Sequence, residues 1–314
     1  MRISKERLLE IISVASEKGW EFAKNHFGLK REDTIRRYIA EAENLHLEIP
    51  NYTEGKNKIK VLAFDLELGK ALFELFGTGK QYVRADCMVR DQLLFCWCGE
   101  WLQTGEQIGD YCTRAEIEAH DDKRVCKSLY NAIDEADIIL GHNIGYFDMP
   151  MAKKKFIEYG FKPLAKKQQI DTYRIAKKNF RFQGNGLDFL SKEFGFSGKM
   201  ETEKSLWKKV SEGSEEAMRK MYEYCQQDVK ATIDLYFHMR GWMSWHPNIA
   251  LLNEEEDVCP VCLSKNFYKD GYYHTVVHKY PQFRCNDCDS IFRSGKSSKD
   301  DKPDEAVRLR VTPK

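Results

Sequence analysis

The stretch Val61-Leu-Ala-Phe-Asp-Leu-Glu-Leu68 has the length and apolar character of a buried β-strand. Asp65 and Glu67 stand two residues apart in it, so both side chains point to the same face of the strand. Burying two carboxylates in an apolar strand is unfavourable unless something positive lies between them. The stretch therefore predicts either a cation site on a central strand or an acidic strand end that is exposed to solvent.

Two later segments carry further acidic residues. Gly141-His-Asn-Ile-Gly-Tyr-Phe-Asp148 follows a short apolar strand, and Asp148 is expected to open the next helix. Tyr224-Cys-Gln-Gln-Asp228 falls within a long predicted helix, where a spacing of four residues puts Tyr224 and Asp228 on one face. Each segment also has an ordinary interpretation, because acids are common at helix N-caps and on helix surfaces.

In this order, the three segments resemble the motifs of the DEDD superfamily of 3′–5′ exonucleases. That family has D-x-E on its first strand, N-x-x-x-F-D after a central strand and Y-x-x-x-D on a late helix. The matching residues are Asp65, Glu67, Asn143, Phe147, Asp148, Tyr224 and Asp228. A sister subclass has His five residues before the last Asp, and this chain has Glu223 there, so the resemblance is to the tyrosine subclass. The resemblance covers about residues 59–243, and it is closest to the exonuclease domain of family B DNA polymerases and related bacterial and phage exonucleases.

The resemblance implies an α/β, RNase H-like mixed sheet with helices packed on it, and a metal-dependent 3′–5′ exonuclease that uses two metal ions. Mg²⁺ and Mn²⁺ prefer carboxylate oxygens, and four carboxylates would hold two such ions. By resemblance the metal ligands and catalytic acids are Asp65, Glu67, Asp148 and Asp228, and Tyr224 is a catalytic residue that orients water. Asn143 and Phe147 would contact the terminal nucleotide, together with Leu68, which stands where relatives often have Thr.

Two cysteine pairs, Cys259-Pro-Val-Cys262 and Cys285-Asn-Asp-Cys288, indicate a separate C-terminal module. Four thiolates at this spacing fit one structural Zn²⁺ with tetrahedral geometry. We expect strands between the pairs, with a turn at Lys269-Asp-Gly271, so the module resembles the zinc ribbons of transposases and transcription factors. Its basic and aromatic residues suit nucleic-acid binding, while a protein-docking or purely structural ribbon is an equal alternative. The other six cysteines are interpreted as small buried residues of a reduced protein.

Composition and punctuation predict four segments. They are a helix-turn-helix-like helical module over 1–50, an RNase H-like exonuclease domain over 57–245, a zinc ribbon over 258–294, and a poorly ordered tail over 295–314. In the second segment the pattern predicts strands at 59–67, 72–76, 93–101 and 137–140, and helices at 121–136, 148–159, 170–180, 187–194 and 214–243.

Charge and hydropathy limit the partners. The chain of 314 residues has 50 Lys and Arg against 49 Asp and Glu, so its total charge does not indicate nucleic acid. Residues 149–182, however, hold ten basic residues against two acids, a patch that could hold phosphates or simply be a solvated surface. The chain has no run of about 18 apolar residues and its N-terminus has no signal-peptide pattern, so we expect no membrane partner and a cytoplasmic protein of bacterial or phage origin.

The expected substrate is nucleic acid with single-stranded 3′ ends, with DNA favoured. The expected role is in replication or repair, with a separate polymerase or another replication protein as a partner. A transposase or integrase-like protein also combines helix-turn-helix, RNase H-like and zinc-binding modules, but it lacks the D-x-E and Y-x-x-x-D pair. A non-catalytic nucleic-acid-binding regulator is the third alternative, and the presence of all four acids and the tyrosine argues against it.

Overall fold

A computed structural model describes residues 7, 9–12, 59–77, 79–80, 82–196, 205–253, 256–276 and 278–297. The chain divides into two compact units. One contains Ile59–Met239 and Met243–Pro247, and the other contains Arg240–Trp242 and the described part of Asn248–Lys314. The two units are described separately below.

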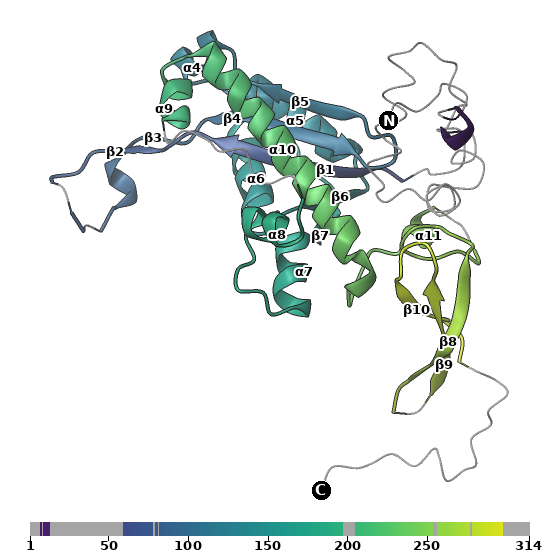
Figure 1. Cartoon of the computed structure of the whole chain (residues 1–314). Helices are drawn as coiled ribbons and strands as arrows, with labels where there is room; N and C mark the ends of the chain where they lie inside the picture. Colours follow the sequence, from purple (N-terminus) through teal and green to yellow (C-terminus); the bar gives the residue numbers. More distant parts are fainter. Residues whose placement is uncertain are drawn as a thin grey trace, which may run out of the picture. The chain divides into compact units, whose positions relative to one another are not determined.

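The first unit is built on a five-stranded mixed sheet with the order β5-β4-β1-β6-β7 (Figure 1). Its strands are β1 (Val61–Leu68), β4 (Leu94–Trp101), β5 (Gln107–Tyr111), β6 (Ile138–Gly141) and β7 (Gln168–Asp171). β1 lies in the centre, antiparallel to β4 and parallel to β6, and β7 continues the parallel half. Because β5 is antiparallel to β4, β4 alone runs against the other four strands.

The central strand β1 is apolar on both faces, as a strand covered on both sides should be. Six of its eight residues are buried, and the two half-buried ones are Asp65 and Glu67. The strand expected from the sequence is therefore confirmed, and its two acids are its least buried residues.

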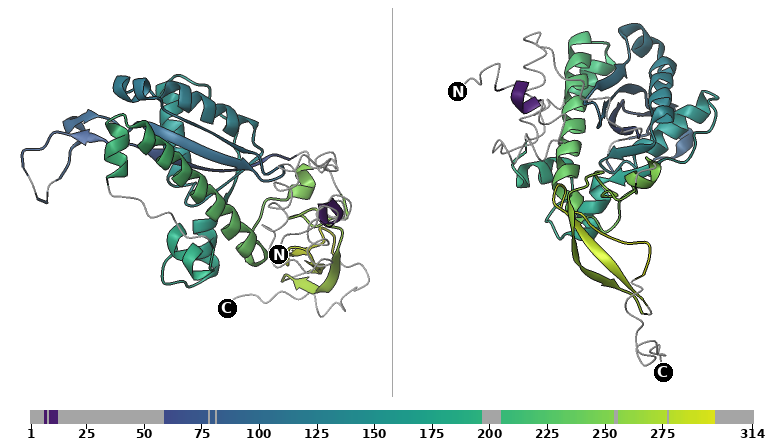
Figure 2. Two further views of the ribbon diagram at one scale, coloured as in Figure 1. Left: turned by 45° about the horizontal axis from the view of Figure 1, so that its top comes forward. Right: turned by 90° about the vertical axis from the view of Figure 1, so that its right-hand side faces the viewer.

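Helices cover both faces of this sheet. Trp97 Nε1 donates a hydrogen bond to Ser128 Oγ of α5 (Lys123–Glu135), while Cys98 Sγ donates to the Tyr222 carbonyl of α10 (Glu215–Met239). Adjacent residues of a strand point to opposite faces, so α5 and α10 lie on opposite sides of β4. Figures 1 and 2 show α10 running across one face of the sheet with α5 on the other. The predicted RNase H-like arrangement of a mixed sheet with packed helices is confirmed.

A buried ion pair anchors α6 (Asp148–Glu158) to the sheet. The Asp122 carboxylate is fully buried, accepts a hydrogen bond from the Leu94 backbone N–H at 2.6 Å and pairs with Lys155 Nζ at 2.8 Å. The Tyr159 hydroxyl also donates to this carboxylate. Burial alone would raise the pKa of Asp122, but these three donors together lower it. The position of α6, and with it that of Asp148, therefore depends on one charged group at the start of α5.

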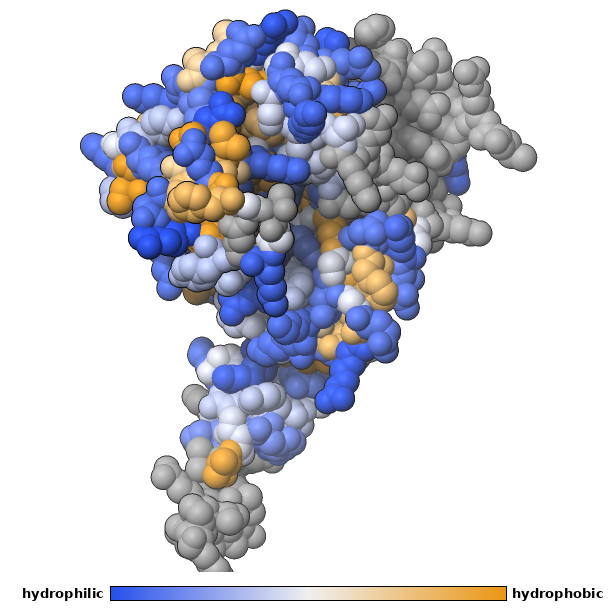
Figure 3. Space-filling view, turned by 90° about the vertical axis from the view of Figure 1, so that its left-hand side faces the viewer, coloured by the Kyte–Doolittle hydropathy of each residue, from blue (hydrophilic) through white to orange (hydrophobic). Residues whose placement is uncertain are grey.

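Several shorter elements complete the first unit: β2 (Leu72–Phe73), β3 (Met88–Arg90), the 3₁₀ helix η1 (Ala85–Cys87), α4 (Arg114–Ala119), α7 (Thr172–Asn179), α8 (Leu187–Glu193) and α9 (Leu206–Ser211). The predicted strand 72–76 is wrong beyond Phe73, because only Leu72 and Phe73 pair with β3. The predicted helix 170–180 starts two residues later, since Ile170 and Asp171 belong to β7. Figure 3 shows small hydrophobic patches on a largely hydrophilic face.

The second unit contains η2 (Arg240–Trp242), α11 (Ile249–Leu252) and a three-stranded sheet of order β10-β9-β8. Its strands are β8 (Phe267–His274), β9 (Lys279–Cys285) and β10 (Ile291–Arg293). The predicted turn at Lys269-Asp-Gly271 is wrong. The register shifts there, so the segment is a bulge within β8, and Gly271 takes a φ of 76°. The chain reverses instead between Thr275 and His278, which share a backbone hydrogen bond of 2.8 Å.

Of the predicted N-terminal module, the structure describes residues 7 and 9–12, which are helical. The helix-turn-helix-like segment after them lies outside the described residues, as does the tail from residue 298. The boundaries of the four predicted segments remain predictions.

Candidate active site

Three carboxylates from two elements meet on the α10 face of the sheet. Asp65 and Glu67 project from β1, and Asp228 projects from α10, which packs across β1 and β4. One oxygen atom of each carboxylate lies within 4.8 Å of the others. A group of carboxylate oxygens this close together suits a hard divalent cation. The sequence motifs predicted all three residues as site residues, and the packing of α10 on β1 brings them together.

Asp148 is the fourth acid of this region, at the first position of α6 and only 3% exposed. It does not belong to the group of three, but its negative charge raises the pKa of Asp65. The pKa of Asp65 lies well above its usual value, first because packing around the carboxyl group keeps water away from it, and then because Cys225, Asp148, Glu67 and Asp228 disfavour its ionised form. Burial likewise raises the pKa of Asp148 to about 7, against the lowering effect of its own and the Leu66 backbone N–H groups. The site therefore stores electrostatic repulsion that a bound cation would relieve.

Three buried thiols lie directly behind the carboxylates. Cys98 and Cys96 of β4 pair in register with Asp65 and Glu67, and Cys225 Sγ of α10 lies 3.4 Å from the Asp65 carbonyl oxygen. All three cysteines are buried and unbridged, as the sequence predicted. They fill the space between sheet and helix with small, weakly polar groups.

The loop before α6 is held by Asp171. The Asp171 carboxylate accepts hydrogen bonds from the Asn143 N–H at 3.0 Å, the Gly145 N–H at 3.3 Å and the Arg174 N–H at 3.2 Å. Asn143 adopts a φ of 64°, a left-handed conformation that Asn tolerates better than most residues. Asp171 therefore has a structural role, and it fixes the loop that leads through Phe147 to Asp148.

The remaining predicted residues lie around the same region. Tyr224 is buried one helical turn before Asp228, and its ring meets Trp207 edge-on with centroids 5.9 Å apart. Phe147 is 46% exposed, and Leu68 is the last residue of β1. His142 Nδ1 lies 2.9 Å from Thr172 Oγ1, so this side chain packs at the end of the strand.

A cleft of about 770 Å³ opens beside this loop, and the sequence had indicated it only as part of a long basic stretch. Its lining comprises Asn143, Gly145, Tyr146, Tyr173, Arg174, Lys177 and Lys178. The spacing of the last four residues on α7 was the available signal, since residues three and four apart share a helix face.

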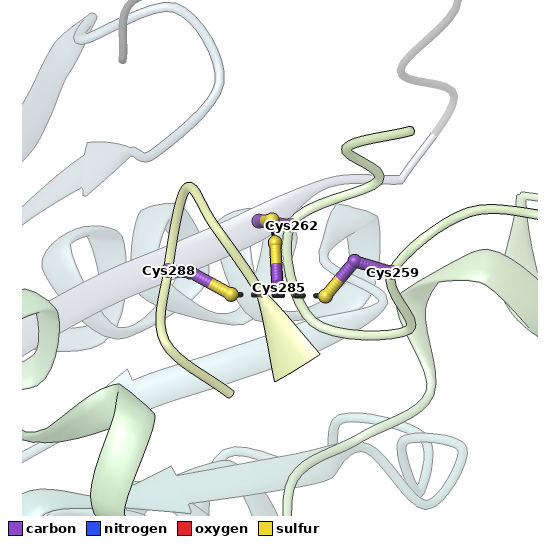
Figure 4. A group of neighbouring side chains, drawn as sticks. All are labelled: Cys259, Cys262, Cys285 and Cys288. Atoms are coloured by element: carbon purple, nitrogen blue, oxygen red, sulfur yellow. Dashed lines mark hydrogen bonds between the residues drawn. The ribbon is translucent and has the colours of Figure 1, made fainter. Parts of the chain in front are cut away.

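The second unit brings its four cysteines into one cluster. The four sulfur atoms all lie within 4.8 Å of one another. The Cys259 and Cys288 sulfurs are 3.7 Å apart, and the Cys262 and Cys285 sulfurs are 3.6 Å apart. Figure 4 shows the four side chains converging on one point. These separations are far longer than a disulfide bond of about 2.05 Å. Four sulfurs at about 2.3 Å from a tetrahedral Zn²⁺ would be about 3.8 Å apart, so the cluster is consistent with structural zinc.

Comparison with a protein-family model supports the RNase H-like assignment. Residues 96–240 match the family model of the RNase H superfamily. Residues 96–240 form an RNase H superfamily domain. The matched range includes Asp148, Tyr224 and Asp228 and begins after Asp65 and Glu67.

The family B DNA polymerase from the hyperthermophilic archaeon Pyrobaculum calidifontis is similar in structure to part of the chain. The TM-score is 0.44 at 18% sequence identity, with 58% of this chain and 25% of the polymerase covered. The chain thus matches about a quarter of the polymerase's length. Among curated proteins, none matches the chain. Within the described residues, no helix is both long enough and apolar enough to cross a membrane.

Proposed function

We propose that the RNase H-like domain is a metal-dependent 3′–5′ exonuclease that removes nucleotides from single-stranded 3′ ends, with DNA favoured. The observation that carries this proposal is the convergence of Asp65, Glu67 and Asp228, with Asp148 acting on Asp65 from the start of α6. Burial of Asp65 and the nearby charges of Asp148, Glu67 and Asp228 all raise the pKa of its carboxyl group, so a bound cation would stabilise the ionised form.

Two Mg²⁺ or Mn²⁺ ions held here would lower the pKa of an attacking water and stabilise the leaving 3′ oxygen. Asp65, Glu67 and Asp228 would hold the ions, and Asp148 would complete the negative charge of the site. Tyr224, whose side chain has a reference pKa of about 10, would orient the water through its hydroxyl rather than deprotonate it at neutral pH. Asn143, Phe147 and Leu68 would contact the terminal nucleotide.

The reaction proposed is hydrolysis of the last phosphodiester bond. Water adds to phosphorus, the bond to the 3′ oxygen breaks, and that oxygen takes a proton. The products are a nucleoside 5′-monophosphate and a strand that is one nucleotide shorter with a 3′ hydroxyl.

For the second unit, we propose that Cys259, Cys262, Cys285 and Cys288 bind one structural Zn²⁺ and form a zinc ribbon. Phe267, Phe283 and Phe292 pack against each other beside these cysteines, so a very small apolar core accompanies the cluster. Such a core is too small to fold the segment without the metal.

End-labelled strands test the nuclease proposal. Single strands of DNA and RNA that carry a 5′ label should give a ladder of products shortened from the 3′ end in Mg²⁺ or Mn²⁺, and 3′-labelled strands should release labelled mononucleotide first. Asp65→Ala and Asp228→Ala should abolish both signals. Internal cleavage, or activity that survives both substitutions, would contradict the site assignment. Strand binding without cleavage in wild type would favour a regulator.

A further inference from the structure

The cleft beside the Asn143 loop is bounded by two elements. Asn143, Gly145 and Tyr146 come from the loop between β6 and α6, and Tyr173, Arg174, Lys177 and Lys178 come from α7. Asp171 joins the two elements, because it accepts hydrogen bonds from the loop and also caps α7. The walls of the cleft are therefore fixed relative to each other and to Asp148, which follows the loop directly.

The cations of the cleft differ in their contacts from the other basic residues nearby in the chain. Lys155 is buried against Asp122, Lys154 pairs with Asp91, and Lys167 donates to the Asp134 carbonyl. By contrast, no ion pair joins Arg174, Lys177 or Lys178 to any residue that the structure describes, and all three are exposed. Part of the basic stretch therefore stabilises the fold, while Arg174, Lys177 and Lys178 bring three positive charges together at this cleft.

Aromatic rings accompany these cations. Tyr146 is 83% exposed, which is unusual for a large aromatic residue in an ordered loop. The Tyr173 ring is held edge-on by His142 with centroids 5.6 Å apart, and Lys177 Nζ lies 5.8 Å from the Tyr173 ring centroid. Gly145 keeps the floor open, since a β-carbon there would approach Gln169 Oε1 to 3.0 Å. Exposed rings between cations form the type of surface on which bases of a single strand stack.

We propose that this cleft binds the single-stranded segment on the 5′ side of the nucleotide that is removed. Arg174, Lys177 and Lys178 contact backbone phosphates, and Tyr146 and Tyr173 stack on bases. Single strands fit because the bases of a duplex are paired and do not present their faces to side chains. The inference rests on the proposed function for the direction of the strand, because the cleft adjoins the loop that leads to Asp148.

The test compares two double substitutions of equal charge. Arg174→Ala/Lys177→Ala removes two cations from the cleft. Lys162→Ala/Lys166→Ala removes two exposed cations from the segment that precedes β7. The cleft lies at the carboxyl ends of the parallel strands β6 and β7, whereas this control segment leads into the amino end of β7. Both are made in wild-type protein and in the Asp65→Ala background, where the strand survives.

Binding of a fluorescent 12-nucleotide strand of DNA or RNA to the Asp65→Ala proteins is measured by anisotropy across a salt series. The cleft variant should bind about tenfold more weakly, and its log–log salt slope should be shallower by about 1.4, or about 0.7 for each lost phosphate contact. The control pair should leave both unchanged. Tyr146→Ala should weaken binding with the slope kept, because stacking releases no counterions. If the cleft variant equals the control in affinity and slope, the proposal is overturned.

Turnover separates this inference from the proposed function. In the otherwise wild-type protein, the ratio of oligonucleotide hydrolysis to hydrolysis of thymidine 5′-(p-nitrophenyl phosphate) should fall about tenfold in the cleft variant. If wild type cleaves neither substrate but the cleft substitutions still weaken strand binding, the cleft stands as a single-strand site and the nuclease proposal fails. If the ratio and the binding are both unchanged, the nuclease proposal is unaffected and the cleft inference fails.

Discussion

Asp148→Asn should stabilise the metal-free protein, and the gain should grow with pH. The pKa of Asp148 is about 7 in the fold and about 3.9 in an unfolded chain. Between these values the folded state binds more protons than the unfolded state, so the free energy of unfolding falls as pH rises. Each pKa unit corresponds to 1.36 kcal/mol, so the ionised group destabilises the fold at pH 8 by on the order of 4 kcal/mol.

The amide of the variant does not titrate, so the stability difference between the two proteins reports the ionisation of Asp148, together with its effect on the pKa of Asp65. We expect the difference to change in favour of the variant by roughly 1.4 kcal/mol per pH unit between about pH 4 and pH 7, and to level off above. Denaturant unfolding in EDTA at pH 4.5, 6 and 8 measures it. Asp134→Asn, at an exposed position on α5, is the matched control.

The slope is decisive because any packing cost of the amide is the same at each pH. Adding Mg²⁺ or Mn²⁺ at pH 8 should stabilise wild type and should stabilise the variant much less, since the cation relieves repulsion that the variant lacks. A stability difference that does not depend on pH would refute the reasoning. It would mean that burial does not raise the pKa of the Asp148 carboxyl group.

Tyr224→Phe should slow the bound-strand chemical step while strand affinity is kept, as measured by single-turnover cleavage; a fall in affinity without slower chemistry would make the tyrosine a substrate contact. Cys285→Ser or chelation should remove zinc, as measured by elemental analysis, and unfold the ribbon, since structural zinc in small peptides contributes on the order of 10–16 kcal/mol; reduced protein purified without zinc would contradict this. Lys155→Ala should cost about 3–5 kcal/mol by leaving Asp122 buried without its partner, and a loss under 1 kcal/mol in denaturant unfolding would contradict it. Because the pKa of Asp122 is lowered, its contribution is present above the unfolded value of about 3.9 and is lost as pH falls below it.

Local sequence signals predicted the elements that carry the site. The apolar run around Asp65, the four-residue spacing of Tyr224 and Asp228, and the cysteine pairs all depend on periodicity or chemistry within a few residues. The capping box from Thr113 to Glu116 is an equally local signal, but the helix that it starts, α4, was not predicted.

Features that depend on distant partners were not predictable in this way. β5 alternates between exposed and half-buried residues and has few apolar ones, so it is defined by its pairing with β4. The bulge at Gly271 depends on the register with β9, where Tyr272 faces Pro281, a residue without an N–H to donate. The sequence alone could not distinguish the exposed cations of the cleft from Lys154, which forms an ion pair, because its partner Asp91 is 63 residues away in the chain.

Hydrolysis in H₂¹⁸O tests the central claim most directly. If the carboxylate cluster of Asp65, Glu67 and Asp228 directs water at the last phosphodiester bond, wild-type protein in Mg²⁺ should release nucleoside 5′-monophosphate that carries one ¹⁸O on phosphorus. Asp65→Ala, purified in parallel, should release none. Release of nucleoside 3′-monophosphate, or equal incorporation by the Asp65→Ala protein, would contradict the account.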